Sequence, residues 1–247
     1  MMRFRWDAWR RQPAATREAL AAGLASLLSP HTALFSLLGH KGDLMLTHFR
    51  PSFADLNEAQ LALDRHPISD YLEHTTSYLS VIELGLYEST GKAYADLTAK
   101  GFAPHSDEWN AGIKDVLDRQ RAAMSPRLYP EIPNHPWVCF YPMDRRRGEH
   151  KNWYQVPMAE RARMMQEHGL VGRRYAGVVR QIISGSIGFD DWEWGVDLFA
   201  EDPLVFKQLI YEMRFDEVSA VYALFGTFYV GQRVLPDQVS ALLQVSE

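Results

Sequence analysis

The order of elements predicted for the second half of the chain limits its fold more than any other feature of the sequence. Apolar and alternating runs predict strands, and amphipathic patterns predict helices. Before the last helix, Asp202 is placed as an N-cap and Pro203 as the first helical residue. The predicted elements are a strand over 137–143, a helix over 158–173, strands over 178–187 and 194–200, the helix from Pro203, and a strand over 222–230. This order is typical of a ferredoxin-like unit.

The first half shows a reduced version of the same order. The predicted elements are a helix over 7–28, strands over 33–38 and 43–49, a helix over 53–64, a strand over 77–87, a loop over 89–104 and a helix over 106–124. We therefore expect an α+β fold, in which two ferredoxin-like units form a dimeric α+β barrel within one chain. No strict repeat is visible, so the duplication is inferred from element order alone.

A proline-rich stretch separates the two halves. Proline cannot donate a backbone hydrogen bond to a helix or a sheet, so closely spaced prolines predict an extended connector. The prolines concerned are Pro126, Pro130, Pro133 and Pro136. We expect an N-terminal ferredoxin-like half over residues 1–125 and a C-terminal half over residues 126–247 that carries the functional site.

Composition excludes several classes of protein. The 247 residues are 47% hydrophobic and carry a formal net charge of -5, which argues against a general nucleic-acid binder. No apolar run approaches the roughly 18 residues of a membrane span. The single cysteine, Cys139, rules out an internal disulfide and fits a reducing compartment. Since Cys139 lies in an apolar strand, a buried structural thiol is favoured over a nucleophile.

The N-terminus has two interpretations. Several arginines precede the small apolar stretch Ala19 to Leu28, a pattern that a signal peptide also shows. However, the leucines of this stretch recur at i, i+4, i+7 and i+8, which is the pattern of an amphipathic helix. They are Leu20, Leu24, Leu27 and Leu28. We favour a folded first helix and a cytoplasmic protein.

His168 is the histidine with the most informative surroundings. It follows Met164 and Met165 by one turn of the predicted helix and precedes Gly169. One interpretation is a histidine favoured by the dipole at a helix C-terminus, with Gly169 as the C′ residue. The other is an axial iron ligand offered from the last helical turn, because neutral imidazole is a common haem ligand. Spacing alone favours the first.

Two further polar features allow both a structural and a functional interpretation. Gln181 shares a strand face with Val179 and Ile183, so it is either a hydrogen-bonded core residue or a residue that faces a ligand. Tyr141 lies near the end of a strand that opens into a basic turn, 145–147. That turn is either a solvated loop or a clamp for carboxylates, because arginine can bind a carboxylate through two parallel hydrogen bonds.

The second half contains a series of short motifs that occur in order over about ninety residues, from Tyr141 to Gly231. They are Tyr141-Pro-Met-Asp-Arg-Arg, Asn152-Trp-Tyr, Glu167-His-Gly-Leu-Val-Gly-Arg, Gln181-Ile-Ile-Ser-Gly-Ser, Asp190-Asp-Trp-Glu-Trp, Leu209-Ile-Tyr-Glu-Met-Arg-Phe-Asp-Glu-Val-Ser-Ala and Phe228-Tyr-Val-Gly. In these motifs the second half resembles the coproheme decarboxylase branch of the chlorite-dismutase-like haem proteins. Two stretches of the first half, Gly39-His-Lys-Gly-Asp and Ser77-Tyr-Leu-Ser-Val-Ile-Glu-Leu, match more loosely.

This resemblance implies roles for individual residues. His168 is expected to be the proximal iron ligand, Tyr141 the radical carrier and Gln181 a residue on the distal side of the iron. The residues that match propionate-binding positions are Arg127, Arg214 and Ser219. Arg145 stands where the family usually has lysine, and arginine keeps the charge but changes the geometry of the donor.

The resemblance also implies an activity. Family members convert coproheme III to haem b with hydrogen peroxide as oxidant, and two propionates become vinyl groups through a tyrosyl radical. Coproheme is both substrate and redox cofactor. The expected assembly is a cytoplasmic homopentamer in haem biosynthesis, with a ferrochelatase-type protein as a transient donor of coproheme.

Three alternatives are kept. Chlorite dismutase has the same fold but carries a distal arginine where this chain has Gln181. A haem-binding or sensing protein with weak peroxidase activity would need His168 but not Tyr141 or the arginines. A haem-free barrel protein would need none of these residues.

Overall fold

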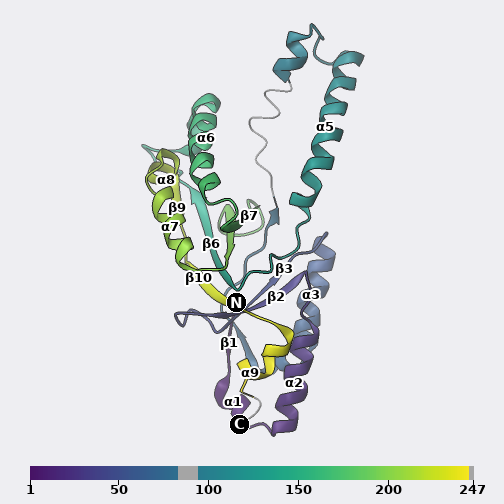
Figure 1. Ribbon diagram of the computed structural model, residues 1–247, viewed down its shortest axis with the longest axis vertical. Helices are drawn as coiled ribbons and strands as arrows, with labels where there is room; N and C mark the ends of the chain where they lie inside the picture. The colour runs from purple at the N-terminus through teal and green to yellow at the C-terminus, as the bar shows by residue number, and fades with distance from the viewer. Residues whose placement is uncertain (83–93, 245–247) are drawn as a thin grey trace.

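The computed structural model describes residues 1–82 and 94–244 (Figure 1). The α-helices are α1 Trp6–Arg10, α2 Ala14–Ser26, α3 Phe53–Arg65, α5 Asp107–Leu128, α6 Met158–Arg174, α7 Leu204–Met213, α8 Glu217–Tyr222 and α9 Val239–Leu242. The strands are β1 Met2–Phe4, β2 Thr32–Leu37, β3 Leu44–His48, β4 Leu72–His74, β5 Val81–Ile82, β6 Trp137–Arg145, β7 Val179–Gly185, β8 Trp194–Ala200, β9 Ala223–Phe225 and β10 Tyr229–Val234. Three short 3-10 helices cover Pro67–Tyr71, Trp153–Gln155 and Pro236–Gln238.

One antiparallel sheet runs through both halves of the chain. Its strand order is β4-β1-β3-β2-β10-β6-β8-β7-β5, with β9 paired to the end of β6. The C-terminal strand β10 lies between β2 and β6, with Val234 opposite Leu34 and Gly231 opposite Val138. The expected α+β class is confirmed, and among the described residues the sheet is open at β4 and β5, so it does not close into a barrel.

The sheet is nevertheless strongly curled. Phe35 on β2 and Phe199 on β8 are three strand positions apart, which is roughly 14 Å in a flat sheet. Their ring centroids are only 6.3 Å apart, and both side chains are fully buried. The concave face therefore forms a core between the halves, to which Val138, Phe140 and Ile182 also contribute.

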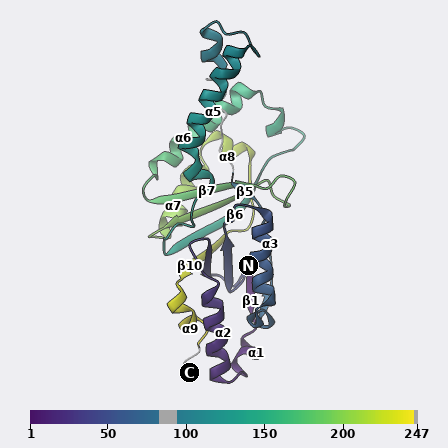
Figure 2. The same ribbon diagram turned by 90° about the vertical axis from the view of Figure 1, so that its right-hand side faces the viewer.

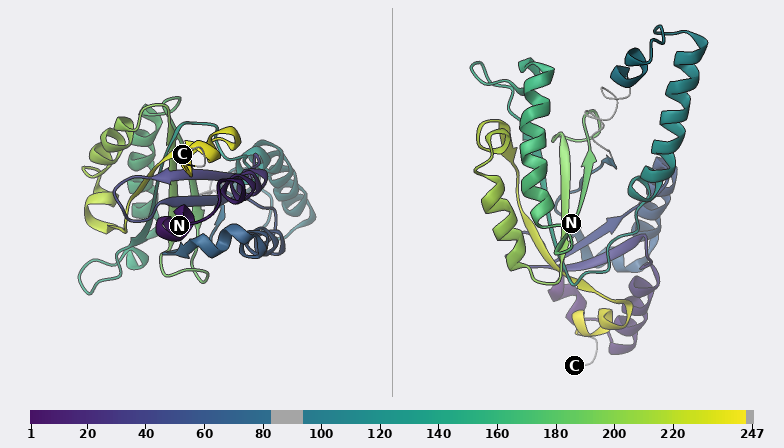
Figure 3. Two further views of the ribbon diagram at one scale, coloured as in Figure 1. Left: turned by 90° about the horizontal axis from the view of Figure 1, so that it is seen from below. Right: turned by 45° about the horizontal axis from the view of Figure 1, so that its top comes forward.

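Helices cover the convex face. In the second half, α6, α7 and α8 lie on one side of β6, β7 and β8, and α5 stands apart on the other side (Figures 1 and 3). In the first half, α2 and the C-terminal helix α9 lie together at one end of the molecule (Figure 2). There the Trp9 Nε1–H donates to the Leu243 carbonyl at 2.7 Å, which ties the C-terminal segment to the N-terminal helices.

Several predicted boundaries are wrong, and the structure gives the reasons. The helix expected over 7–28 is two helices, because Pro13 is the N-cap of α2 and interrupts the first run. The loop expected over 89–104 contains helical residues 94–99, where Leu97 is buried and Tyr94 stacks on Trp109. Residues 100–104 form no helix or strand, as expected, and residues 89–93 lie outside the described residues.

The prolines and the last strand also differ from the prediction. Helix α5 continues through Pro126 to Leu128, so the extended connector covers only 129–136. The strand expected over 222–230 breaks at Gly226, where a Cβ atom would lie within 2.9 Å of Pro142 and Trp192 side-chain atoms. The strand expected over 77–87 is present only as β5, and 83–87 lie outside the described residues.

Asp197 is a carboxylate on the concave face. It is the cross-strand neighbour of Phe140 and Ile182, and burial raises its pKa to about 7. An acid whose pKa is higher in the folded state is most compatible with folding when protonated. The free energy of unfolding should therefore decline as the pH rises from about 4 to about 7.

We predict that Asp197→Asn removes this decline. At pH 8 the variant should be more stable than the wild type by up to about 4 kcal/mol, less the part that water near the carboxylate screens. Urea unfolding at several pH values measures the difference, with the exposed Asp191→Asn as control. A gap between variant and wild type that is the same at pH 5 and pH 8 would contradict the assignment.

Candidate functional site

His168 is held by a carboxylate from a neighbouring helix. Its Nδ1–H donates to Asp216 Oδ2 at 2.9 Å, and the Asp216 side chain is only 5% exposed. Asp216 is also the N-cap of α8, where Oδ1 accepts the Ser219 N–H at 2.8 Å. Because this hydrogen bond engages Nδ1, it leaves Nε2 as the nitrogen that can bind a metal.

The carboxylate of Asp216 carries charge inside this cluster. Burial raises its pKa, but the hydrogen bonds from His168 and Ser219 outweigh that effect, so the pKa of Asp216 lies below its ordinary value. The Ser219 hydroxyl donates to Asp216 Oδ2 at 3.1 Å. Ser219 is thus buried beside His168, and its predicted contact with a propionate stays a prediction.

His168 lies well inside α6 rather than in its last turn, so the interpretation in which Gly169 is the C′ residue is wrong. The helix continues to Arg174, close to the end predicted at residue 173, and basic side chains occupy its last turn. A Cβ atom at Gly172 would make ordinary contact with Met213 Cε of α7, at 3.4 Å. Nearby Val171 packs against the core under α7. Tertiary packing, and not the local glycine pattern, therefore sets the helix end.

Tyr141 and Gln181 lie on the sheet face that α6 and α7 cover. In antiparallel pairing, directly opposite residues share a face. Tyr141 pairs through Val196 with Ile183, and Cys139 pairs through Leu198 with Gln181. This confirms that Gln181 shares a face with Ile183, whose side chain is 42% exposed.

Burial governs the chemistry of the two titratable groups on β6. Tyr141 is 4% exposed, and its ring stacks on Phe228 at 4.6 Å. Burial raises the pKa of the Tyr141 phenol above its ordinary value, while the charges of Arg145 and Arg214 act to lower it. Burial raises the pKa of Cys139 to about 12, so this thiol is not a thiolate nucleophile at neutral pH.

Two of the predicted arginines lie near Tyr141. The Arg145 guanidinium stacks over Trp153 at 5.1 Å, and its Nη2 lies 3.5 Å from the sulfur of Met165, one turn before His168. Arg214 lies 4.7 Å over the ring of Phe225, which packs against Tyr141. The structure therefore brings Arg145 and Arg214 together with Tyr141.

Arg127 is less connected to the site. It lies exposed in the last turn of α5, on the other side of the sheet from α6. Among the contacts of the described residues, none joins Arg127 to His168 or Tyr141. Its role as a propionate ligand remains a prediction.

The sequence analysis did not identify Asp216 and Glu193 as parts of the site. The pattern Asp216-Glu-Val-Ser is a typical N-cap pattern and could have indicated the start of α8, though not the bond to His168. Glu193 has a buried carboxylate that accepts the Arg145 N–H at 2.8 Å and pairs with Arg147 at 3.5 Å. It therefore fixes the end of β6.

The arrangement is suited to an iron porphyrin with acidic substituents. It offers one imidazole with Nδ1 held by a carboxylate, an apolar sheet face, and cations near a buried phenol. Within residues 1–82 and 94–244, no group of three or more metal-ligating side chains forms an all-protein metal centre. Two hollows among the described residues lie elsewhere: one of about 70 Å³ beside His48 and Arg50, and one of about 360 Å³ beside Glu131 and Arg233.

Comparisons with known proteins agree with this description. The fold has the architecture of chlorite-dismutase-like α+β proteins, and the profile described as "Chlorite dismutase" matches residues 12–234. The chain therefore belongs to the chlorite dismutase family. In the part of the chain that the structure describes, no helix is long and apolar enough to cross a membrane.

Three relatives give the range of similarity. A coproheme decarboxylase of Staphylococcus carnosus is 44% identical over 87% of this chain and 78% of its own length. The solved structure of a novel heme-binding protein from Thermus thermophilus has a TM-score of 0.81 and 38% identity, and covers 98% of this chain and 92% of its own. A Haloquadratum walsbyi protein, whose name proposes heme binding, is 43% identical over 97% of this chain.

The archaeal relatives are longer proteins. This chain spans 44% of the Haloquadratum walsbyi protein and 38% of a Natronomonas pharaonis relative.

We predict that Asp216→Asn lowers the free energy of unfolding of the protein even without any ligand. Loss of a buried charged acceptor should cost about 1.5–3 kcal/mol of stability at pH 7. Because the pKa of Asp216 is lowered on folding, its contribution is present above about pH 4 and lost on further acidification. Urea unfolding at pH 7 and pH 3 measures this change.

The matched control is another histidine–carboxylate pair. His135 and Glu201 are also 2.9 Å apart, but the Glu201 side chain is 76% exposed. Glu201→Gln should change stability by less than about 1 kcal/mol. If both variants lose the same stability at pH 7, Asp216 has no special role in holding His168.

Proposed function

We propose that this protein converts coproheme III to haem b by two successive oxidative decarboxylations, with hydrogen peroxide as oxidant. The observation that carries the proposal is that the buried Tyr141 phenol lies near the guanidinium groups of Arg145 and Arg214, on the sheet face that is covered by α6, the helix of His168. Similarity to a coproheme decarboxylase over most of the chain supports it.

The proposal assigns a separate role to each of the site residues. His168 binds the iron through Nε2, and Asp216 keeps the ring in the required tautomer and orientation. Arg145 and Arg214 bind propionate carboxylates near Tyr141, and Arg127 and Ser219 are further propionate contacts. Gln181 lies on the sheet face, so it approaches the ligand from the side opposite α6 and faces the oxidant.

Bound coproheme supplies the iron redox chemistry that peroxide drives. Tyr141 loses one electron and its phenolic proton, and the resulting tyrosyl radical removes a hydrogen atom from a propionate side chain. Loss of a second electron and of carbon dioxide leaves a vinyl group. The raised pKa of Tyr141 keeps the phenol protonated until that step.

The proposal extends to the cellular setting. We place the protein in the cytoplasm, as a homopentamer in haem biosynthesis that receives coproheme from a ferrochelatase-type enzyme. The motifs shared with the coproheme decarboxylase branch support this setting.

Tyr141→Phe is the direct test of the radical role. Phenylalanine preserves the stack on Phe228, so coproheme should still bind, but it removes the phenolic hydrogen. A role in hydrogen bonding alone would reduce the rate by about tenfold, whereas the radical role predicts near-complete loss. Mass spectrometry after addition of peroxide measures the loss of the two carboxyl groups.

The exposed Tyr211→Phe serves as the control variant and should keep full activity. Substantial conversion to haem b by Tyr141→Phe would overturn the assignment and direct attention to Trp153 and Tyr154. Sustained oxygen release from chlorite by the wild type would instead favour chlorite dismutase activity.

The carboxylate clamp gives a separate prediction. Arg214→Ala should weaken coproheme binding by a cost between that of an exposed pair, about 1 kcal/mol or less, and that of a buried pair, about 3–5 kcal/mol. It should hardly change binding of the same porphyrin with its propionates esterified. Absorbance titrations of both ligands measure this, and an equal loss for both would contradict a carboxylate role.

A further inference from the structure

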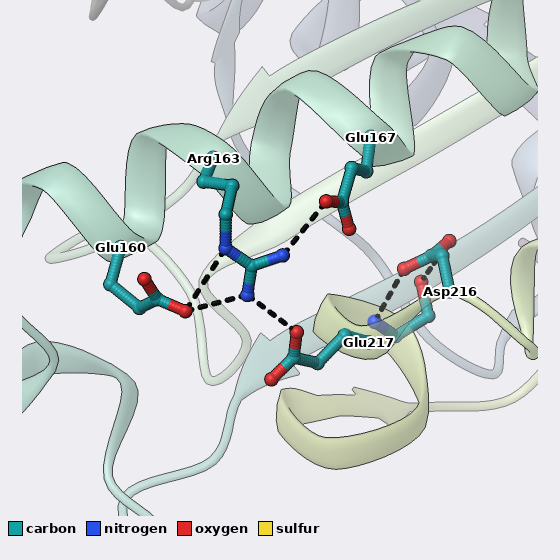
Figure 4. Close-up of polar contacts among 6 residues, drawn as sticks. Glu160, Arg163, Glu167, Asp216 and Glu217 are labelled. Carbon is teal, nitrogen blue, oxygen red and sulfur yellow. Dashed lines mark hydrogen bonds and ion pairs between the residues drawn. The ribbon is translucent and has the colours of Figure 1, made fainter.

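One guanidinium group joins the helix of His168 to the helix of Asp216. Arg163 on α6 contacts three carboxylates, as Figure 4 shows. Its Nη1 lies 2.8 Å from Glu167 Oε1, and its Nη2 lies 2.5 Å from Glu160 Oε1. The same Nη2 lies 2.6 Å from Glu217 Oε2 on α8. Only the contact with Glu217 crosses between the helices.

This contact is adjacent to the hydrogen bond that orients the imidazole. Glu217 follows Asp216 directly, and Arg163 precedes His168 by five residues on α6. Two consecutive residues of α8 therefore bind two residues of α6, through the pairs Asp216–His168 and Glu217–Arg163. Helix α8 is only six residues long, so a shift of its first turn would move both carboxylates together.

We propose that Arg163 is a positioning residue, which holds the first turn of α8 through Glu217 and so keeps Asp216 against Nδ1 of His168. The functional meaning of this arrangement rests on the proposed role of His168 as an iron ligand. The orientation itself is a property of the chain without any ligand.

Charge makes the network sensitive to the loss of Arg163. Hydrogen bonds that Arg163 donates to Glu160, Glu217 and Glu167 raise the pKa of Arg163 above its ordinary value, so its cation is always present. Without that cation, three carboxylates remain near one another, and the repulsion separates Glu217 from α6. All four side chains are 43–50% exposed, so salt should also weaken the contact.

The apolar contact between the helices does not depend on this network. Met164 of α6 packs with Val218 and Tyr222 of α8 in a buried cluster that also contains Trp153. A variant of Arg163 or Glu217 should therefore keep its fold and lose only the exact placement of the α8 first turn. Such a variant therefore tests the positioning of Asp216 separately from the stability of the fold.

The experiment uses the ligand-free protein labelled with nitrogen-15 histidine. The Nδ1–H resonance of His168 reports its hydrogen bond to Asp216 through its chemical shift and its exchange with water. In Glu217→Gln and Arg163→Met the resonance should move upfield, with severalfold faster exchange. In the wild type, salt of about 1 M, where the Debye length is about 3 Å, should move it the same way.

Glu160→Gln is the matched control, because it removes one carboxylate contact of Arg163 within α6 but leaves the contact with α8. It should leave the resonance unchanged. The proposal is overturned if Glu217→Gln leaves the resonance unchanged, or if Glu160→Gln moves it equally. The salt arm needs no variant, so a variant that failed to fold would not remove the test.

A second measurement connects the network to the ligand. Glu217→Gln should weaken coproheme binding by at most about fivefold, the range of a partly exposed ion pair. If the protein did not bind coproheme while the resonance still responded to Glu217→Gln, the proposed function would fail and the positioning role of Arg163 would stand.

Discussion

The position of β10 between β2 and β6 is the constraint on which the rest of the structure depends. It is the last strand of the chain, yet it pairs with the first long strand of one half and the first strand of the other. The curl that brings Phe35 to Phe199 requires this continuous sheet. Neither half can therefore complete its core before the C-terminal residues arrive, and such long-range pairing is expected to slow folding.

The geometry of the candidate site is determined by that sheet. Strand β6 pairs with β10, β8 and β9, and it presents Tyr141 and Arg145 near its end. The imidazole reaches the site from α6, and its carboxylate partner comes from α8, 48 residues further along the chain. Helix α8 leads directly into β9, and β9 pairs with β6. This pairing therefore also determines the position of Asp216 at the start of α8.

The local sequence pattern predicted an element correctly where the pattern and the tertiary packing favour the same structure. The strand 194–200 is apolar except for Asp197 and was predicted with its observed bounds. Prediction failed where a distant contact decides the outcome. One interpretation of His168 placed a helix end at Gly169, yet α6 continues to Arg174 and Val171 packs against the core. Asp216 could be read as a cap, but its bond to His168 exists only after α8 docks on α6. Whether the sheet closes into a barrel likewise depends on contacts between its edge strands, which no local sequence pattern describes.

The electrostatics of Tyr141 link burial to the proposed chemistry. Burial favours the neutral phenol, and the cations of Arg145 and Arg214 oppose that preference. A ligand that brings carboxylates to those guanidinium groups compensates their charge and so removes the opposing effect. Binding an acidic porphyrin would then raise the pKa of the phenol further, which keeps the hydrogen that the tyrosine must give up. The two arginines that we propose as ligand contacts would thereby make binding favour the protonation state that the proposed reaction needs.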